Sequence, residues 1–467
     1  MHFKIAVSDK TKAHFSLKKA DADFSTNQIV LNALVGTLVK YGPSGRIEPY
    51  LAESWNVSID KKIWQFKIRK GFACADGTLI TANLIHHNLI ESLKNYSARG
   101  SVIMFDHLSG WDDFVKNKTS DLKGLSTQGE TLEFRFTENP DDLLELLRMP
   151  YFGLWVEKDG HLISSGPYTV ESYTDSLIKL GIRQDWFTAD ERSFKSIEVS
   201  FVNFEDFQKE GVSDKTIVRV PFYVTQTSPV ANSYWVTSPP TRLESFVLSP
   251  TKKSFFDDPA NRAVFRNRVN SLDTDLVKSK FFYSSASTKG LNYSGIKYSS
   301  NAERPTALTF AIERATCSEE EIQKIEKIIL FALEGSGQKF ELLRRDMNDK
   351  DWFKKTDTNH FFDARVASVD IGGYPNYTAI KMMFCTKLGI NFPDHNGRIC
   401  KIVTDGIQSA KNVDKNFIDD FNKAIHEDAV VIPLFHHSDK WLVSDDLDPV
   451  SLPPTTLYPQ FELIRSR

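Results

Sequence analysis

The chain has 467 residues, of which 41% are hydrophobic and 25% are charged, and this composition excludes general disorder. Its 58 basic and 61 acidic residues give a formal net charge of −3, which excludes a protein whose main task is to bind nucleic-acid phosphates. The length favours about three domain-sized units.

Strand patterns dominate the first half of the chain. Four segments alternate apolar with polar residues and are therefore predicted strands: 63–69, 131–137, 178–182 and 197–201. Thr81 is placed to cap a predicted helix over about 82–94. Asp159-Gly160 lies between two short apolar runs, and this dipeptide is typical of a tight hairpin turn.

The second half of the chain is richer in predicted helices. One amphipathic helix is expected over 318–335, where Ser318 and Glu321 form a capping box, and another over 414–427. Short apolar runs predict buried strands at 308–312 and 429–435. Strands that alternate with helices at this spacing indicate α/β layers around a mixed sheet.

Two stretches have the composition of connectors. Pro239-Pro240 stiffen one extended segment, and the turn-rich segment 444–456 is the other. No apolar run reaches the length of a membrane-spanning helix. The first ten residues contain no apolar h-region, so we expect no secretory signal in the chain as given, as would also hold for a mature secreted protein.

Motifs for catalysis and for metal binding are not found. The sequence has no G-x-S-x-G, G-x-G-x-x-G or G-x-x-x-x-G-K motif. The adjacent histidine pairs at 86–87 and 436–437 cannot easily chelate a metal, because neighbouring side chains point in different directions. We therefore expect no enzyme activity, no cofactor and no metal site.

The cysteines offer no recognisable pattern either. The chain contains four of them and no C-x-x-C pair: Cys74, Cys317, Cys385 and Cys400. Two cysteines and one histidine between 385 and 400 fall short of the four ligands of a structural zinc site. We interpret all four as buried or incidental thiols, with one disulfide as the alternative.

The segment Gly45–Ile85 carries the most informative motif. It contains, in order, LAESW at 51–55, RKG at 69–71, DGT at 76–78 and TA at 81–82. This series resembles the signature of the family-5 extracellular solute-binding proteins, the dipeptide, oligopeptide and nickel receptors of ABC importers. Tyr50 and Cys74 depart from the family pattern, which commonly has a small residue or proline at the first position and Phe at the second.

The resemblance continues over nearly the whole chain and thins between about 267 and 300. Four further segments are similar to family motifs: 164–173, Trp186-Phe187, 254–265 with its arginine Arg262, and 428–435. The family implies an α/β fold of the two-lobed class II periplasmic-binding-protein type, with an inserted subdomain and two hinge crossovers. The implied lobe I is discontinuous (1–36, 164–240 and 438–467), the inserted subdomain is 37–163, and lobe II is 241–437.

The implied function is that of a substrate-binding receptor of an ABC importer. It would capture a peptide or similar small solute in an interlobe cleft by hinge closure. The implied partners are this small-molecule ligand and a membrane permease, without nucleic acid, and we expect a monomer. The implied location is periplasmic, or extracellular as a membrane-anchored lipoprotein. Two alternatives stay open: a ligand-sensing domain of a cytoplasmic regulator, and a receptor for a sugar or metal chelate.

Asp370 is the first ligand candidate that the resemblance implies. Peptide receptors of the family carry an aspartate four residues before a proline, and it pairs with the peptide's ammonium group. Here Ile371 is four residues before Pro375, and Asp370 is one position further back. A one-residue shift reverses the face of a strand, so Asp370 would serve only if Gly372-Gly373 hold a bulge. A structural role at a strand end is the alternative.

The other candidates are aromatic and basic side chains. Aromatic residues would cover the ligand by stacking, and arginines would bind an anionic end. The candidates are Trp155, Tyr234, Trp235, Tyr374, Tyr377, Arg344 and Arg365. For the aromatic residues ordinary core packing is the alternative, and for the arginines a solvated position.

Overall fold

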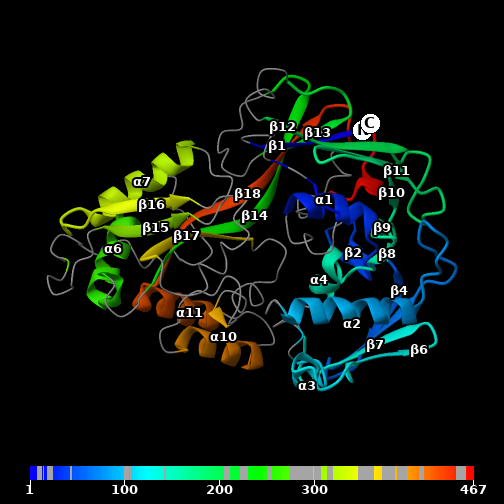
Figure 1. The fold of residues 1–467 in the computed structure, drawn as a ribbon, viewed down its shortest axis with the longest axis horizontal. Helices are drawn as coiled ribbons and strands as arrows, with labels where there is room; N and C mark the ends of the chain where they lie inside the picture. Colours follow the sequence, from blue (N-terminus) through cyan, green and yellow to red (C-terminus); the bar gives the residue numbers. More distant parts are fainter. Residues whose placement is uncertain are drawn as a thin grey trace. The chain divides into compact units, whose positions relative to one another are not determined.

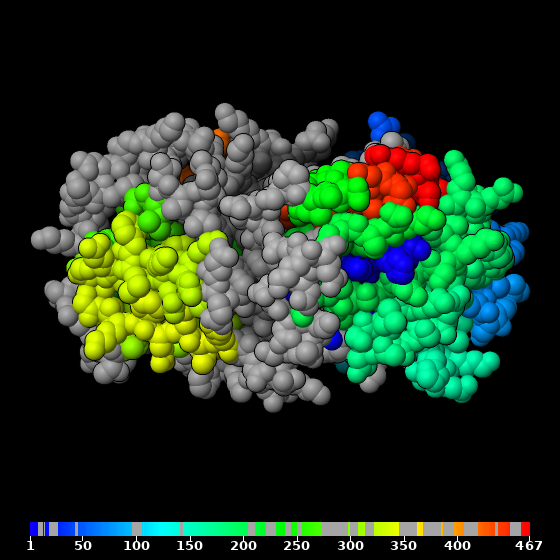
Figure 2. All heavy atoms as spheres, turned by 90° about the horizontal axis from the view of Figure 1, so that it is seen from above, coloured from blue at the N-terminus to red at the C-terminus, as the bar shows by residue number. Residues whose placement is uncertain are grey.

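The structure is a computed structural model, and the residues that it describes are coloured in Figures 1 and 2. These residues are 1–7, 13, 15–17, 25–42, 45–98, 105, 107–140, 143–203, 211–220, 230–249, 255–272, 298, 307–312, 319–344, 362–370, 384–385, 397–409, 415–448 and 459–467. The chain divides into two compact units. Unit 1 comprises Met1–Pro239 and Asp439–Arg467, and unit 2 comprises Pro240–Ser438.

Unit 1 is built on a mixed sheet whose interior contains the first strand of the chain. Its strands are β1 (His2–Val7), β10 (Tyr168–Tyr173), β11 (Leu177–Ile182), β12 (Ser196–Asn203), β13 (Thr216–Val220) and β18 (Val431–Ser444). They are ordered β10-β11-β12-β1-β13-β18. β1 runs parallel to β12 and β13, whereas β11 and β18 pair antiparallel with their neighbours.

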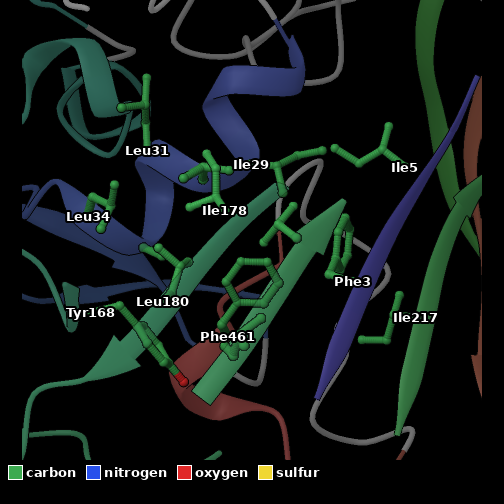
Figure 3. Packing of buried hydrophobic residues seen from close by; sticks show 14 of the residues in the cluster. Phe3, Ile5, Ile29, Leu31, Leu34, Tyr168, Ile178, Leu180, Ile217 and Phe461 are labelled. Atoms are coloured by element: carbon green, nitrogen blue, oxygen red, sulfur yellow. The ribbon is translucent and has the colours of Figure 1, made fainter. Parts of the chain in front are cut away.

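One face of this sheet carries the main core of unit 1 (Figure 3). Side chains of β1 and β13, such as Phe3 and Ile217, pack there with Ile29 from helix α1 (Ser25–Leu34). Phe461, from the short helix η7 (Phe461–Leu463), places its ring edge-on to Phe3 with the centroids 5.3 Å apart. The alternate residues of the same strands, such as Val218, belong to a smaller cluster on the other face.

The segment with β2 to β9 also belongs to unit 1, and we refer to residues 37–163 as the 37–163 layer. It contains a four-stranded antiparallel sheet in the order β4-β5-β7-β6, and α2 packs across β6 and β7 (Figure 1). The bounds are β2 (Val39–Tyr41), β3 (Ile47–Pro49), β4 (Ala52–Val57), β5 (Ile63–Ile68), α2 (Ala82–Ala98), α3 (Trp111–Val115), β6 (Leu125–Gln128), β7 (Thr131–Arg135), α4 (Leu143–Leu147), η4 (Pro150–Phe152), β8 (Val156–Lys158) and β9 (His161–Ile163).

Local sequence signals in this layer are confirmed. The backbone N–H of Leu84 donates to Thr81 Oγ1 at 3.2 Å, so Thr81 caps α2, which extends four residues beyond the predicted end at 94. Asp159 and Gly160 connect β8 to β9 with φ angles of 52° and 77°. Two successive positive φ angles are what a type I′ hairpin turn requires.

Unit 2 contains a second set of strands with helices packed on them. Its elements are β14 (Ser233–Leu248), which begins in unit 1, η5 (Phe255–Asp257), α6 (Pro259–Ser271), β15 (Leu308–Ile312), α7 (Glu319–Leu333), β16 (Phe340–Arg344), β17 (Ala364–Asp370), α10 (Arg398–Ser409) and α11 (Lys415–Asp428). The strand order is β14-β17-β15-β16, with β15 parallel to both of its neighbours. Apolar residues of α6 and α7 form one core with these strands. The two predicted helices of the second half, 318–335 and 414–427, are confirmed as α7 and α11.

Arginines of α6 contact the C-terminal ends of neighbouring helices. Arg262 donates through Nε to the carbonyl oxygen of Asp428 at 3.0 Å, and Arg266 donates to the carbonyl of His426. Both carbonyls lie in the last turn of α11, where helical carbonyls have no partner within the helix. Arg268 donates in the same way to carbonyls at the end of α7. The arginine that the family motif contains is therefore a helix-end contact.

One expectation from the sequence is corrected. Cys385 and Cys400 form a disulfide with their Cα atoms 5.1 Å apart, so the preferred interpretation as thiols is wrong for this pair. Cys74 is a buried thiol, as expected, and Cys317 lies outside the described residues. Pro239-Pro240 lie inside the extended strand β14, where the chain passes from unit 1 to unit 2.

Candidate functional site

The structure separates the two adjacent aromatic candidates at the start of β14. Tyr234 packs against the main core of unit 1, and its hydroxyl donates to the carbonyl oxygen of Leu447 at 3.1 Å. Burial raises the pKa of Tyr234 to about 12, so its phenol is neutral at physiological pH. Trp235 packs against the smaller cluster on the opposite face. The two rings therefore cannot cover the same side of one ligand.

Trp155 is buried in unit 1. Its side chain is 4% exposed, and its indole N–H donates to the carbonyl oxygen of Pro150 at 2.8 Å. Its backbone N–H donates to Asn88 Oδ1 at 3.0 Å, which ties it to α2. These contacts favour a packing role for Trp155.

The two arginine candidates of unit 2 lie on opposite faces of its strands. Arg365 in β17 is paired with Ala311 of β15, and Arg344 at the end of β16 is paired with Ile312. Paired residues share a face of a sheet, whereas successive residues of one strand alternate. The sheet geometry therefore directs Arg344 and Arg365 to different sides.

Asp370 is the last residue of β17, and its backbone is paired in register with Arg242 of β14. Tyr374, Tyr377 and the glycines of the predicted bulge lie outside the described residues.

A buried polar cluster at the unit boundary was missed by the sequence analysis. We call Arg219, Ser238 and Asp439 the boundary cluster. Arg219 in β13 donates to Asp439 Oδ1 at 2.9 Å, and the two side chains are 10% and 7% exposed. The backbone N–H of Asp439 donates to Ser238 Oγ at 2.9 Å. The signal in the sequence was an arginine inside the otherwise apolar run TIVRV at 216–220.

The boundary cluster lies on the two strands that connect the units. Ser238 is in β14, one residue before the last unit-1 residue of that strand, and Asp439 is the first unit-1 residue of β18. The cluster therefore joins the two connections through a cross-strand hydrogen bond and fastens β18 to β13 through an ion pair. The boundary cluster thus places a buried ion pair on β18, one of the two strands that connect the units.

A second buried polar cluster joins the 37–163 layer to the C-terminal segment. We call Lys40, Tyr50, Trp186 and Glu462 the Lys40 cluster. Lys40 Nζ lies 2.7 Å from Glu462 Oε1, and the side chains are 6% and 1% exposed. The Tyr50 hydroxyl donates to the same oxygen at 2.9 Å and accepts from the Trp186 indole N–H at 3.1 Å. Burial and Glu462 raise the pKa of Tyr50, so this departure from the family motif provides a neutral donor.

Among the described residues, no helix combines the length and the apolar character that crossing a bilayer requires. In that same part of the chain, no three histidine, cysteine or acidic side chains are grouped so as to hold a metal ion.

The chain is similar to known proteins in sequence. Residues 46–287, more than half of the chain, match the model described as "Bacterial extracellular solute-binding proteins, family 5 Middle". The chain is 27% identical over 144 residues to the periplasmic oligopeptide-binding protein OppA of Escherichia coli K12. That alignment covers 28% of this chain and only 26% of OppA.

Solved structures share the fold over the whole chain. The murein tripeptide-binding protein MppA of Escherichia coli has a TM-score of 0.76 at 18% identity, with 100% of this chain and 98% of MppA covered. NikA of Brucella suis, solved in complex with Fe(III)-EDTA, has a TM-score of 0.72 at 14% identity, with 100% of both chains covered. These likenesses establish the expected two-lobed binding-protein fold. Together with the family model, they show that this chain belongs to family 5 of the bacterial extracellular solute-binding proteins.

Proposed function

We propose that the chain is the solute-binding receptor of an ABC importer and that it binds a peptide or a similar small solute by hinge closure. The observation that carries this proposal is the family match together with a fold shared over 100% of the chain with a tripeptide-binding protein. The oligopeptide-binding relative supports a peptide over other solutes.

The proposed receptor acts without making or breaking covalent bonds. Its affinity depends on the contacts to the ligand and on how strongly the bound state prefers the closed conformation. The chain divides into two units, and among the described residues only the strands β14 and β18 connect them. This division supports closure by a hinge. We propose a monomer, because one chain supplies both units.

Asp370 is the proposed anchor for the ammonium group of a peptide. A charge-assisted hydrogen bond of this kind contributes about 1.5–3 kcal/mol. The position of Asp370 as the last residue of β17 supports the proposal. Arg344 or Arg365 would bind the opposite, anionic end. Each aromatic candidate would cover one face of the ligand: Tyr234, Trp235, Tyr374 and Tyr377. Because Trp155 is engaged in packing, it has the least support of the aromatic candidates.

The proposed partner is the permease of an ABC importer, and the proposed location is periplasmic or extracellular, with a lipid anchor as one form. The disulfide between Cys385 and Cys400 supports this location, since disulfides persist in oxidising compartments.

The test is native mass spectrometry of the purified protein, followed by calorimetry with trialanine. We expect a co-purified peptide, and after its removal a 1:1 complex with trialanine. Asp370→Asn should weaken binding about ten- to hundredfold. The matched control Asp60→Asn, at an exposed hairpin tip, should bind as the wild type does. Wild-type affinity in Asp370→Asn would remove Asp370 from the proposal, and binding of no peptide would overturn the peptide assignment.

A second candidate is a receptor for a metal chelate. It is favoured by the full-length likeness to NikA, which was solved with Fe(III)-EDTA. Calorimetry with Fe(III)-EDTA decides between the two, because the candidate predicts binding of the chelate and none of trialanine.

A further inference from the structure

We infer that the boundary cluster of Arg219, Ser238 and Asp439 positions the two connecting strands, so that the bending between the units is confined to residues on the unit-2 side of Ser238 and Asp439. The inference rests on the proposal that the chain closes around its ligand by a hinge. It assigns a positioning role to three residues that neither the family motif nor the sequence analysis singled out.

The boundary cluster lies next to the point where the chain passes from one unit to the other. Ser238 and Asp439 flank the unit boundary on both connections, and a hydrogen bond of 2.9 Å joins them. A hinge works when a few residues absorb the change in φ and ψ while their neighbours stay fixed. Because Asp439 donates its backbone N–H to the other connection, β14 and β18 cannot separate at this point without breaking that bond.

Asp439 is also bound to the rest of unit 1 by its ion pair with Arg219. Arg219 lies on β13, which pairs with β18 over residues 440–443 and with β1 on its other side. The buried ion pair between Arg219 and Asp439 therefore adds a side-chain contact to the backbone pairing by which unit 1 holds β18. Buried charges that are paired and hydrogen-bonded have a strong geometric preference, because any other arrangement leaves a charge without a partner in a poor solvent.

The two residues after Ser238 differ from it in their hydrogen-bonding capacity. Pro239-Pro240 follow Ser238 directly, and prolines have no N–H to donate to a neighbouring strand. On β14 the residue that accepts the hydrogen bond from Asp439 is therefore followed by two residues that donate no backbone hydrogen bond.

The test uses single-molecule fluorescence transfer in the full chain. Dyes are attached at Ile59→Cys in unit 1 and Leu330→Cys in unit 2, since these side chains are 105% and 60% exposed. Leu330 belongs to α7, which forms part of the surface in Figure 2. Cys317 is changed to Ser in every labelled protein, and the other native cysteines do not interfere. Cys385 and Cys400 are in a disulfide, and Cys74 is buried with its thiol pKa raised to about 11.

The decisive variant is the double change Arg219→Met and Asp439→Leu, which removes both charges and leaves neither one buried alone. We expect native circular dichroism, a broader spread of transfer efficiencies in the ligand-free protein, and about a three- to tenfold weaker Kd for trialanine. The matched control, Arg398→Gln with Glu427→Gln, removes a half-exposed ion pair of unit 2 and should leave both readouts unchanged.

Ser238→Ala is the second variant and keeps the inference testable if the double variant does not fold. It removes the acceptor of the cross-strand hydrogen bond and keeps the ion pair, so we expect a smaller broadening in the same direction. The conservative change Ser238→Thr keeps the hydroxyl and should restore the wild-type spread. An unchanged spread in a folded double variant, or in Ser238→Ala, overturns the inference. Loss of trialanine binding by the wild type would instead overturn the proposed function, because the spread is measured without ligand.

Discussion

The two units stabilise their interiors with different polar contacts. In unit 1 buried charges meet opposite charges, as Lys40 does with Glu462. In unit 2 the buried Arg262 and Arg266 donate to neutral backbone carbonyls at helix ends. Removing one member of an ion pair leaves a buried charge, whereas removing an arginine from a carbonyl leaves a neutral acceptor. Unit 1 should therefore be more sensitive than unit 2 to the loss of one polar side chain.

The largest effect is expected for Lys40→Met in unit 1. The carboxylate of Glu462, which is 1% exposed, would lose its counter-charge, so the free energy of unfolding should fall by about 3–5 kcal/mol. Urea unfolding followed by tryptophan fluorescence measures this loss, since Trp186 contacts Tyr50 in the same cluster. The control Lys40→Met with Glu462→Leu should recover most of it. A single variant as stable as the wild type would show that unit 1 does not depend on the pair.

Breaking the disulfide tests the covalent contribution in unit 2. Cys385 and Cys400 are 15 residues apart, and closing a loop of this length contributes about 3 kcal/mol in the unfolded-chain model. We expect dithiothreitol to lower the urea midpoint of the wild type. The same reagent should not change the midpoint of Cys385→Ser with Cys400→Ser. An intact disulfide leaves two thiols, Cys74 and Cys317, so four reactive thiols in the untreated, unfolded wild type would contradict the disulfide itself.

A smaller loss is expected for Arg262→Met. The variant loses its hydrogen bonds to the carbonyl of Asp428 and to η5, at a cost of about 1.5–3 kcal/mol. Arg268→Met on the same helix is the matched control, because its contacts at the end of α7 are solvent-exposed and should cost less. Equal losses in the two variants would mean that burial does not determine the strength of these helix-end contacts.

The smallest effect is a dependence on pH through His426. Burial and then Arg266 lower the pKa of His426 below its usual 6.5 in the folded chain. The unfolded chain therefore binds the proton first as the pH falls, and stability present above pH 6.5 should be lost below it, by at most about 1.4 kcal/mol per pH unit. His426→Asn should show a flatter profile of unfolding free energy between pH 7 and 5. Identical profiles would exclude His426 as the titrating group.

Short-range features of the fold could be predicted from the sequence. Thr81 before α2 and Asp159-Gly160 between β8 and β9 depend on chemistry within a few residues, which a single sequence displays. The family signature at 45–85 predicted the two-lobed fold because its motifs are long and ordered.

Long-range contacts could not be predicted in the same way. Lys40 and Glu462 are 422 residues apart, and Arg219 and Asp439 are 220 apart. The residues adjacent to each charged side chain in the sequence do not indicate its partner. Only the folded chain brings the two charges of each pair together. The alternation of Tyr234 and Trp235 was available in the sequence, because successive strand residues face opposite ways. Because of this alternation, Tyr234 and Trp235 cannot cover the same side of one ligand.

The Lys40 cluster also has a consequence for the order of events during synthesis. Glu462 and Phe461 belong to unit 1 but leave the ribosome after every residue of unit 2. Domains fold as units during translation, so unit 2 can be complete while unit 1 still has an uncompensated ammonium in its interior. Nascent chains stalled when Ser438 has just left the ribosomal exit tunnel, with the residues after it still inside, should therefore contain a protease-resistant unit 2 and a protease-sensitive unit 1.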